Sequence, residues 1–384
     1  MAVDKRGRKL PKGIRQRSEG FEGRFMYQGK SYLVHGKTIT ETQKLITELK
    51  YKLEHGIYVV KEKITLDEWF TTWLEEYKKN RVKLGTYTNY EKYYKSIIKN
   101  RLGSRQLSEI RGEHIQKLYN ELVKEGYALS SIKIVSAVLN GCLQQAMRNG
   151  LIERNPVRLA ELPRQTGKRK ERIAMTKEQQ ELFMEYAKDS EIADICELFL
   201  STGLRSGELR GLDWETDIDF KNKVIHVTGT LCHSGETGWR KDEPKTRTSK
   251  RDIPMLGNVE RLLKRVRRQQ MEKKLYMGDK WQPVKGFENL VFLEESGLPM
   301  YQSSLKTKVD KIQRAIIKDG HVFEWITPHT FRHTFATRCI ENGIPPQVLK
   351  GILGHSTLSM TMDLYAHVLP DTKAKELQKI ANLF

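Results

Sequence analysis

The N-terminal part of the chain shows two periodicities, one typical of strands and one typical of a helix. Phe21–Gln28 and Lys30–Lys37 are two short strand-like runs, and the Gln28-Gly29 pair between them suits a hairpin turn. A helical pattern follows from Thr40 to about His55 and ends at a glycine. The pattern therefore predicts a small sheet backed by one helix.

The next block, residues 65 to 160, has helical periodicity throughout. Thr65-Leu-Asp-Glu68 is typical of a capping box, and an apolar stripe follows it at spacings of three and four residues. Further helical patterns cover residues 86–99, 112–125 and 130–149. We interpret the stripes as core, which leaves helix N-termini such as Ser130-Ser131, with Lys133 beside them, as candidate phosphate contacts.

A basic linker, residues 161–172, separates this block from the third. It contains Pro, Gly and five basic residues, among them Lys168, Arg169 and Lys170. The linker is either a strap across a DNA backbone or a solvated tether. Thr176 and Gln179 then cap the first helix of the third block, which continues to the C-terminus.

Length and charge extend this picture. The sequence has 384 residues, which suggests two or three domains, and 68 Lys and Arg against 48 Asp and Glu give a formal net charge of +20. Such a surplus favours a polyanionic partner, because each phosphate contact releases counterions. Anionic membranes or ribosomal RNA would attract the same charge.

The basic residues are dense at the N-terminus, where seven occur among the first 17 residues. A basic arm in front of a small sheet suits DNA binding, and Lys12, Arg15, Arg17 and Arg24 are candidate contacts. The alternative is a disordered leader ahead of a structural hairpin.

Several classes of protein are not favoured by the sequence. No apolar run approaches the roughly 18 residues of a spanning helix, and the N-terminus lacks the apolar core of a signal peptide. The four cysteines, Cys142, Cys196, Cys232 and Cys339, form no CxxC pair. We expect a cytoplasmic protein with reduced thiols, no metal and no membrane partner.

Candidate chemistry lies in the third block. In Ser201–Arg210, Arg205 follows a glycine and precedes Glu208, which could hold its guanidinium; an internal salt bridge is the alternative. Pro244–Pro254 follows a predicted strand, Val224–Thr230, and has the character of a β-hairpin with a basic tip that carries Lys245.

Two further segments complete the set. Thr327 and Pro328 begin a helix that places His329, Arg332 and His333 on one face, and a zinc site is not favoured because no third ligand follows. Further on, a Gly-His turn with His355 lies between two helices, and Tyr365 follows. A tyrosine at helical spacing is by itself ordinarily a core residue.

Taken together, the motifs TGLRSGEL, PKTRTSKR, HTFRHTFAT and LGHSTLSMTMDLYAH resemble the signature of the tyrosine recombinase, or phage integrase, family, and the N-terminal block looks like that of integrases of phages and conjugative transposons. The resemblance implies a multidomain, mainly α protein with small β-sheets. It implies an arm-binding domain (three-stranded sheet plus helix) at 1–62, a helical core-binding (SAM-like) domain at 63–160 and a mixed α/β catalytic domain at 173–384. The implied catalytic residues, in chain order, are Arg205, Lys245, His329, Arg332, His355 and Tyr365, with Glu208 in support.

The resemblance also implies the chemistry. Tyr365 would attack the DNA backbone and form a 3′-phosphotyrosine, while Arg205 and Arg332 neutralise the transition state. His329 would accept or polarise the phenol proton, His355 would donate a hydrogen bond to the phosphate, and Lys245 would act as general acid. Lys241 and Lys250 remain alternatives to Lys245. No cofactor is required.

The expected function is integration and excision of a mobile element by strand exchange through a Holliday junction. The implied partners are double-stranded DNA at crossover and arm sites, a homo-oligomer, expected to be a tetramer on DNA, and an excision factor and a host DNA-bending protein. The apolar C-terminal tail, residues 370–384, would pack on a neighbouring protomer or on its own domain. A type IB topoisomerase and a non-catalytic DNA-binding regulator are the alternative functions.

Overall fold

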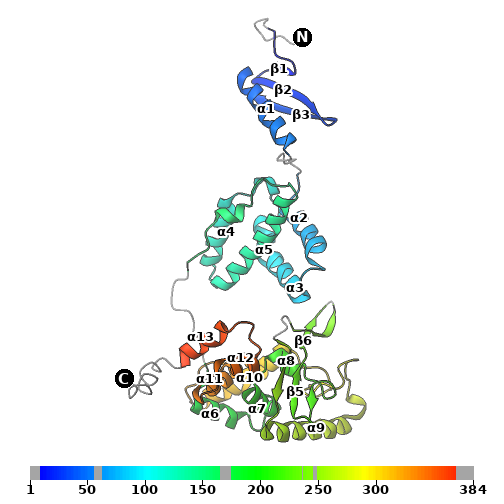
Figure 1. The fold of residues 1–384 in the computed structure, drawn as a ribbon, viewed down its shortest axis with the longest axis vertical. Helices are drawn as coiled ribbons and strands as arrows, with labels where there is room; N and C mark the ends of the chain where they lie inside the picture. Colours follow the sequence, from blue (N-terminus) through cyan, green and yellow to red (C-terminus); the bar gives the residue numbers. More distant parts are fainter. Residues whose placement is uncertain (1–8, 56–62, 165–173, 236, 245–248, 369–384) are drawn as a thin grey trace, which may run out of the picture. The chain divides into compact units, whose positions relative to one another are not determined.

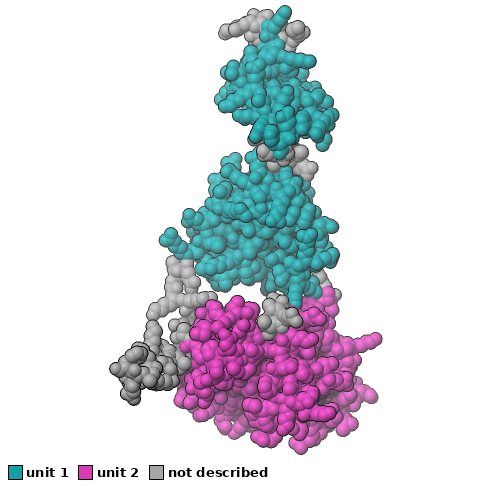
Figure 2. All heavy atoms as spheres, in the orientation of Figure 1, with its two compact units in different colours: residues 1–168 teal, residues 169–384 magenta. Residues whose placement is uncertain are grey.

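The computed structural model describes residues 9–55, 63–164, 174–235, 237–244 and 249–368. The chain forms two compact units, Met1–Lys168 and Arg169–Phe384, each with its own apolar core (Figures 1 and 2). In these ranges helices dominate, and three small antiparallel sheets accompany them. The expected fold class, mainly α with small β-sheets, is therefore confirmed. No helix in the described ranges combines the length and apolar character needed to cross a membrane.

The N-terminal sheet has the order β1-β2-β3, and the helix α1 packs against β2 and β3. At the predicted turn, Gln28 and Gly29 have φ values of 43° and 77°, as a tight hairpin turn requires. Gly23 is needed for the packing of α1, because a Cβ there would lie 2.7 Å from the side chain of Ile46. The elements are β1 (Ile14–Arg17), β2 (Gly20–Tyr27), β3 (Lys30–Gly36) and α1 (Ile39–Glu54).

The helical block of the first unit has the predicted helices. The capping box at Thr65 and Glu68 is present, and the aromatic stripe is buried, with the rings of Phe70 and Tyr94 stacked at 3.6 Å. The predicted helix 86–99 is longer than expected, because its regular part continues as π-helix. The elements are α2 (Leu66–Thr72), η1 (Trp73–Lys78), α3 (Leu84–Tyr93), η2 (Tyr94–Gly103), η3 (Leu107–Glu109), α4 (Gly112–Lys124), α5 (Leu129–Arg148) and η4 (Pro156–Leu159).

The second unit packs helices around two small sheets. In chain order its helices are α6 (Lys177–Ala187), α7 (Ala193–Thr202), α8 (Ser206–Arg210), α9 (Gly257–Met277), η6 (Gly278–Lys280), α10 (Gln302–Lys318), α11 (Pro328–Glu341), α12 (Pro346–Leu353) and α13 (Ser359–Val368). One sheet has the order β4-β5-β8, and β6 and β7 form the other. The strands are β4 (Ile218–Asp219), β5 (Val224–Val227), β6 (Thr230–Ser234), β7 (Gly238–Asp242) and β8 (Arg251–Pro254).

Two of the predicted strand assignments in this unit differ from the described structure. The expected strand Val224–Thr230 is divided, because β5 ends at Val227 and the chain enters the second sheet at Thr230. In the described part of Pro244–Pro254, β8 pairs with β5 and not with a strand of its own segment, whereas β6 and β7 form a hairpin. The predicted tip with Lys245 lies outside the described residues. Gly229 lies at the crossing between the sheets, where a Cβ would lie 3.0 Å from the carbonyl oxygen of Asp242. A side chain at this position would collide with β7, so the crossing requires glycine.

The core of this unit fixes the helix that carries the HTFRH motif. Phe331 on α11 is fully buried and stacks on Phe199 of α7 with ring centroids 5.6 Å apart. It also meets Phe183 of α6 edge to face at 5.4 Å. Because Phe331 is anchored on two helices, the neighbouring Arg332 is held in a defined direction.

Candidate active site

Arg205 lies at a sharp helix-to-helix junction. The helix α7 ends at Gly203, which adopts the left-handed conformation with φ 63°, and Arg205 is the N-cap residue of α8. A Cβ at Gly203 would lie 2.3 Å from the ring of Phe335, so only glycine fits. The TGLR motif thus forms the turn that places Arg205 between the end of α7 and the start of α8.

Glu208 holds Arg205, as the sequence predicted. Its Oε1 accepts a hydrogen bond from Nη1 of Arg205 at 2.8 Å, and its Oε2 accepts one from the Arg205 backbone amide at 2.9 Å. The Arg205 side chain remains 34% exposed, whereas that of Glu208 is only 4% exposed. The carboxylate therefore fixes the guanidinium from the protein side and leaves its outer side accessible.

Arg251, the first residue of β8, belongs to this cluster and was not among the residues predicted from the sequence. Its Nη1 and Nη2 donate to the two carboxylate oxygens of Glu208 at 3.1 and 3.0 Å. Burial raises the pKa of Glu208, but the guanidiniums of Arg251 and Arg205 outweigh it and lower that pKa to about 2. The available signal was the i, i+2 spacing to buried Ile253, which places Arg251 on the inward face of the strand.

Arg332 is buried, with 3% of its surface exposed. Its Nη1 donates to the carbonyl of Gly203 at 2.8 Å, and its Nη2 donates to the carbonyl of Leu353 at 2.6 Å. Burial lowers the pKa of Arg332 to about 9, and the nearby charge of Arg205 acts in the same direction, so the group is still protonated at neutral pH. The partners of this buried cation are dipoles, and an incoming phosphate would supply the countercharge.

His355 follows the left-handed C-cap residue of α12, Gly354. It is 7% exposed, and its Nδ1 lies 3.0 Å from Oγ1 of Thr361. Burial lowers the pKa of His355 to about 4, with further lowering by the charges of Arg332, Arg205 and Arg251. The ring is therefore neutral at pH 7 and can donate one N–H.

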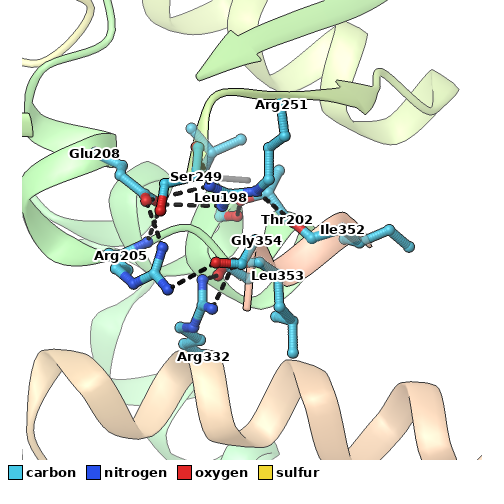
Figure 3. Close-up of polar contacts among 11 residues, drawn as sticks. Leu198, Thr202, Arg205, Glu208, Ser249, Arg251, Arg332, Ile352, Leu353 and Gly354 are labelled. Carbon is cyan, nitrogen blue, oxygen red and sulfur yellow. Dashed lines mark hydrogen bonds and ion pairs between the residues drawn. The ribbon is translucent and has the colours of Figure 1, made fainter. Parts of the chain in front are cut away.

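Figure 3 shows that Arg205, Arg251 and Arg332 converge on one end of α12, although they come from distant parts of the chain. His329 lies on the same helix as Arg332 but on a more exposed side, with its ring centroid 4.7 Å from that of His333. Among the described residues, no group of three His, Cys, Asp or Glu side chains is arranged to hold a metal.

Tyr365 lies on α13 and is partly buried against a small apolar cluster of α11 and α12. Its hydroxyl donates a hydrogen bond to the carbonyl of Ile344. Burial raises the pKa of Tyr365, and proximity to Cys339 acts in the same direction. In this structure the phenol is therefore engaged by the backbone and not by the arginines.

Of the three candidate lysines, Lys245 lies outside the described residues. Lys241, on β7, forms an ion pair of 2.5 Å with the buried carboxylate of Asp217. Lys250 is exposed and directly precedes β8. The geometry thus gives Lys241 a structural contact and leaves the assignment of the general acid to Lys245 as a proposal.

The predicted DNA contacts of the first unit are placed as follows. Arg15 and Arg17 both contact Glu22, at 2.6 and 3.1 Å, and Nε of Arg24 donates to Ser31 at 2.7 Å. Lys12, which precedes β1, is exposed.

Ser130 and Ser131 lie in the first turn of α5, but the amide of Ser131 already donates to the carbonyl of Ala128 at 2.9 Å. The Ser131 amide is thus engaged within the first turn of the helix, and a DNA contact through Ser130 and Ser131 stays a prediction. Lys133 lies one turn further along this helix. Lys168, Arg169 and Lys170 lie outside the described residues.

Comparison with known proteins decides the family. Residues 174–371 match the family model described as the phage integrase family, and residues 65–123 match that of the phage integrase N-terminal SAM-like domain. The chain belongs to the phage integrase family. It is a tyrosine-type site-specific recombinase of the mobile-element integrase kind, so the topoisomerase and regulator alternatives are not supported.

Relatives of this integrase cover most of its length. A tyrosine recombinase XerC-like protein of Caldanaerobacter subterraneus subsp. tengcongensis is 32% identical over 91% of both chains. The transposase of transposon Tn916 from Enterococcus faecalis is 26% identical over 98% of this chain and 96% of its own.

Solved structures agree with this membership. The Tn1549 transposon integrase in complex with transposon right-end DNA has a TM-score of 0.70 and 26% identity, covering 83% of this chain and 100% of that chain. A lambda integrase tetramer bound to a Holliday junction has a TM-score of 0.57 at 19% identity, over 93% of this chain and 95% of that chain, and shares the fold.

Proposed function

We propose that this integrase cleaves and rejoins DNA at a crossover site through Tyr365, with Arg205, Arg332, His355, His329 and Lys245 as its catalytic partners. One observation carries the proposal. Arg205 and Arg332, which are far apart in the sequence, meet at the end of α12 beside neutral His355. Among the described residues, the hydrogen-bond partners of Arg332 are the carbonyls of Gly203 and Leu353 and include no carboxylate. A buried cation of this kind is suited to an anion that arrives with the substrate.

In the proposed reaction the phenol oxygen of Tyr365 forms a bond to phosphorus, and the bond from phosphorus to the 5′-oxygen breaks. The phenol proton passes to His329, and Lys245 protonates the departing 5′-oxygen. Arg205 and Arg332 bind the non-bridging oxygens, and His355 donates its N–H to one of them. Tyr365 must leave the Ile344 carbonyl before it attacks. The 3′-phosphotyrosine then reacts with the 5′-hydroxyl of a second strand.

We further propose three functional parts: residues 1–62 bind arm sites, residues 63–160 bind the crossover site, and residues 173–384 catalyse, with 161–172 as the link. Exchange between two duplexes would require a tetramer on double-stranded DNA and a Holliday junction, as the lambda integrase complex has. An excision factor and a host DNA-bending protein would then choose the direction. The basic surplus of +20 supports the DNA partner.

The test is covalent capture on a nicked suicide substrate made from the element's own end junction. The wild-type protein should become linked to the DNA, and Tyr365→Phe should bind the same DNA with similar affinity but form no adduct. Adducts that persist in Tyr365→Phe would exclude Tyr365 as the nucleophile.

A further inference from the structure

Three arginines donate to three consecutive carbonyls at the C-terminal end of α12. Nε of Arg251 donates to the carbonyl of Ile352 at 2.5 Å, Nη2 of Arg332 to that of Leu353 at 2.6 Å, and Nη2 of Arg205 to that of Gly354 at 3.2 Å (Figure 3). The last carbonyls of a helix have no partner within the helix, and its C-terminal end attracts cations. The end of α12 is therefore a common anchor for guanidiniums from β8, α11 and the N-cap of α8.

Arg251 differs from the other two in how it is used. It makes four hydrogen bonds with the carboxylate of Glu208 and the carbonyls of Ile352 and Ser249, and its side chain is 6% exposed. A guanidinium has five N–H groups, so four are committed to the protein. Arg205 is 34% exposed and keeps an open side. Arg251 therefore faces the protein and Arg205 faces the substrate.

Arg251 is necessary if Arg205 is to offer a net positive charge to the phosphate. If Glu208 had Arg205 as its only cation, the two would form a neutral pair and offer the phosphate little net charge. With Arg251 on the other side of the carboxylate, the group of three carries a net charge of +1. Glu208 can then hold Arg205 in place without cancelling its charge at the substrate.

We propose that Arg251 is a positioning residue for strand cleavage. It compensates the charge of Glu208 and links that carboxylate to the end of α12 by hydrogen bonds. Arg205, Arg332 and His355 can then bind the same phosphate. This inference rests on the proposed roles of Arg205 and Arg332.

The first experiment compares full-length wild-type protein with Arg251→Gln and Arg251→Lys in single-turnover cleavage of the suicide substrate. Arg251→Gln should slow adduct formation by roughly 10²–10³-fold, the size of effect seen when one transition-state donor is lost, with a DNA Kd within about threefold. Arg251→Lys should recover only part of the rate, because one ammonium cannot bond a carboxylate with two parallel N–H groups and a carbonyl as well. Arg265→Gln is the control, since Arg265 on α9 is likewise an arginine held in ion pairs, with Asp194 and Glu197, and lies outside the proposed site.

Two further measurements separate positioning from loss of structure. A methylphosphonate at the scissile position removes one negative charge, so the defect of Arg251→Gln should shrink by at least about tenfold on that substrate. In Arg251→Met alone, the carboxylate of Glu208 cancels the positive charge of Arg205. The double variant Arg251→Met with Glu208→Gln removes that negative charge, so it should cleave faster than Arg251→Met alone.

Wild-type cleavage rates in Arg251→Gln would overturn the proposal. So would an equal defect on both substrates, or strictly additive losses in the double variant, because these are the results of general destabilisation. Failure of the proposed function is distinguishable, since wild-type protein would then form no adduct that depends on Tyr365.

Discussion

The ammonium group of Lys241 lies 2.5 Å from Oδ2 of Asp217, a carboxylate that is 1% exposed. Asp217 also accepts hydrogen bonds from Thr228 and from the amide of Asp213. We predict that Lys241→Met lowers the free energy of unfolding by about 3 kcal/mol, because it leaves a buried carboxylate without its cation. Calorimetry of the full-length protein should show this loss in the transition of the second unit. Adding Asp217→Asn to Lys241→Met should restore part of the lost stability. A Lys241→Met variant as stable as wild type would contradict the structural role of Lys241.

Substitution of Lys245 tests the general acid directly. Lys245→Ala should slow strand cleavage by roughly 10²–10⁴-fold, because the 5′-oxygen then leaves without a proton. A substrate with sulfur in place of that bridging oxygen should recover most of the rate, since a thiol with a pKa of about 8.5 leaves as the anion. Single-turnover cleavage rates of wild type and Lys245→Ala on the oxygen and sulfur substrates test whether Lys245 is the general acid.

Lys241→Ala and Lys250→Ala are the matched controls for that measurement. Any loss in them should be the same on the oxygen and sulfur substrates. A sulfur rescue confined to Lys250→Ala would move the role of general acid to Lys250 and contradict the assignment of Lys245.

The buried ring of His355 predicts a specific loss of stability in acid. Its pKa is lowered from 6.5 to about 4, so the unfolded chain takes up the proton first and stability falls as the pH falls. The neutral His355 ring makes its full contribution to the free energy of unfolding above about pH 6.5. By pH 4 about 3 kcal/mol of that contribution is lost. Urea unfolding at pH 7.5, 6.0 and 5.0 should show a steep decline for wild type and a shallower one for His355→Gln. The pKa of Glu208 is lowered from 4.5 to about 2, so its contribution to stability is lost only below about pH 4.5, outside the measured range of pH 7.5 to 5.0. Equal slopes for wild type and His355→Gln would contradict the prediction.

Local patterns were sufficient to predict the helix ends near Arg205, Arg332 and His355, because each end has its own signals. Their selection as site residues came from the resemblance to the family, and their catalytic roles stay predictions. Gly203 ends α7 before Arg205, Thr327 and Pro328 begin the helix of Arg332, and Gly354 ends α12 before His355. Capping residues act over a few positions and can be read from a short stretch of sequence.

Arg251 could not be found in this way, because its role depends on long-range pairing. The register of β5 and β8 pairs Val227 with Arg251, and only that pairing brings the guanidinium to Glu208. The same pairing was missed when Pro244–Pro254 was assigned as a hairpin of its own. The hydrogen bond of Tyr365 was also unpredictable, since its acceptor is a backbone carbonyl and carries no sequence signal.

The open face of the N-terminal sheet carries a buried carboxylate among arginines. Glu22 and Arg24 alternate with Gly23, which faces α1, so their side chains point away from that helix. Glu22 is 7% exposed and holds both Arg15 and Arg17, whose hydrogen bonds lower its pKa. The carboxylate thus holds two guanidiniums side by side on this face, where we propose that they contact arm-site DNA.

We predict that Glu22→Gln reduces the preference of the integrase for arm-site DNA over random DNA, because the two guanidiniums lose their common anchor. The loss should be about tenfold, the worth of one good base contact, while binding at the crossover site stays the same. Anisotropy titrations at one salt concentration, with arm sites located by footprinting, give the ratio. Glu19→Gln makes the same charge change at an exposed position of this sheet unit and is the matched control. Deletion of residues 1–60 should abolish arm binding and spare the crossover site, whereas equal losses at both sites would show that the unit is structural and does not read arm DNA.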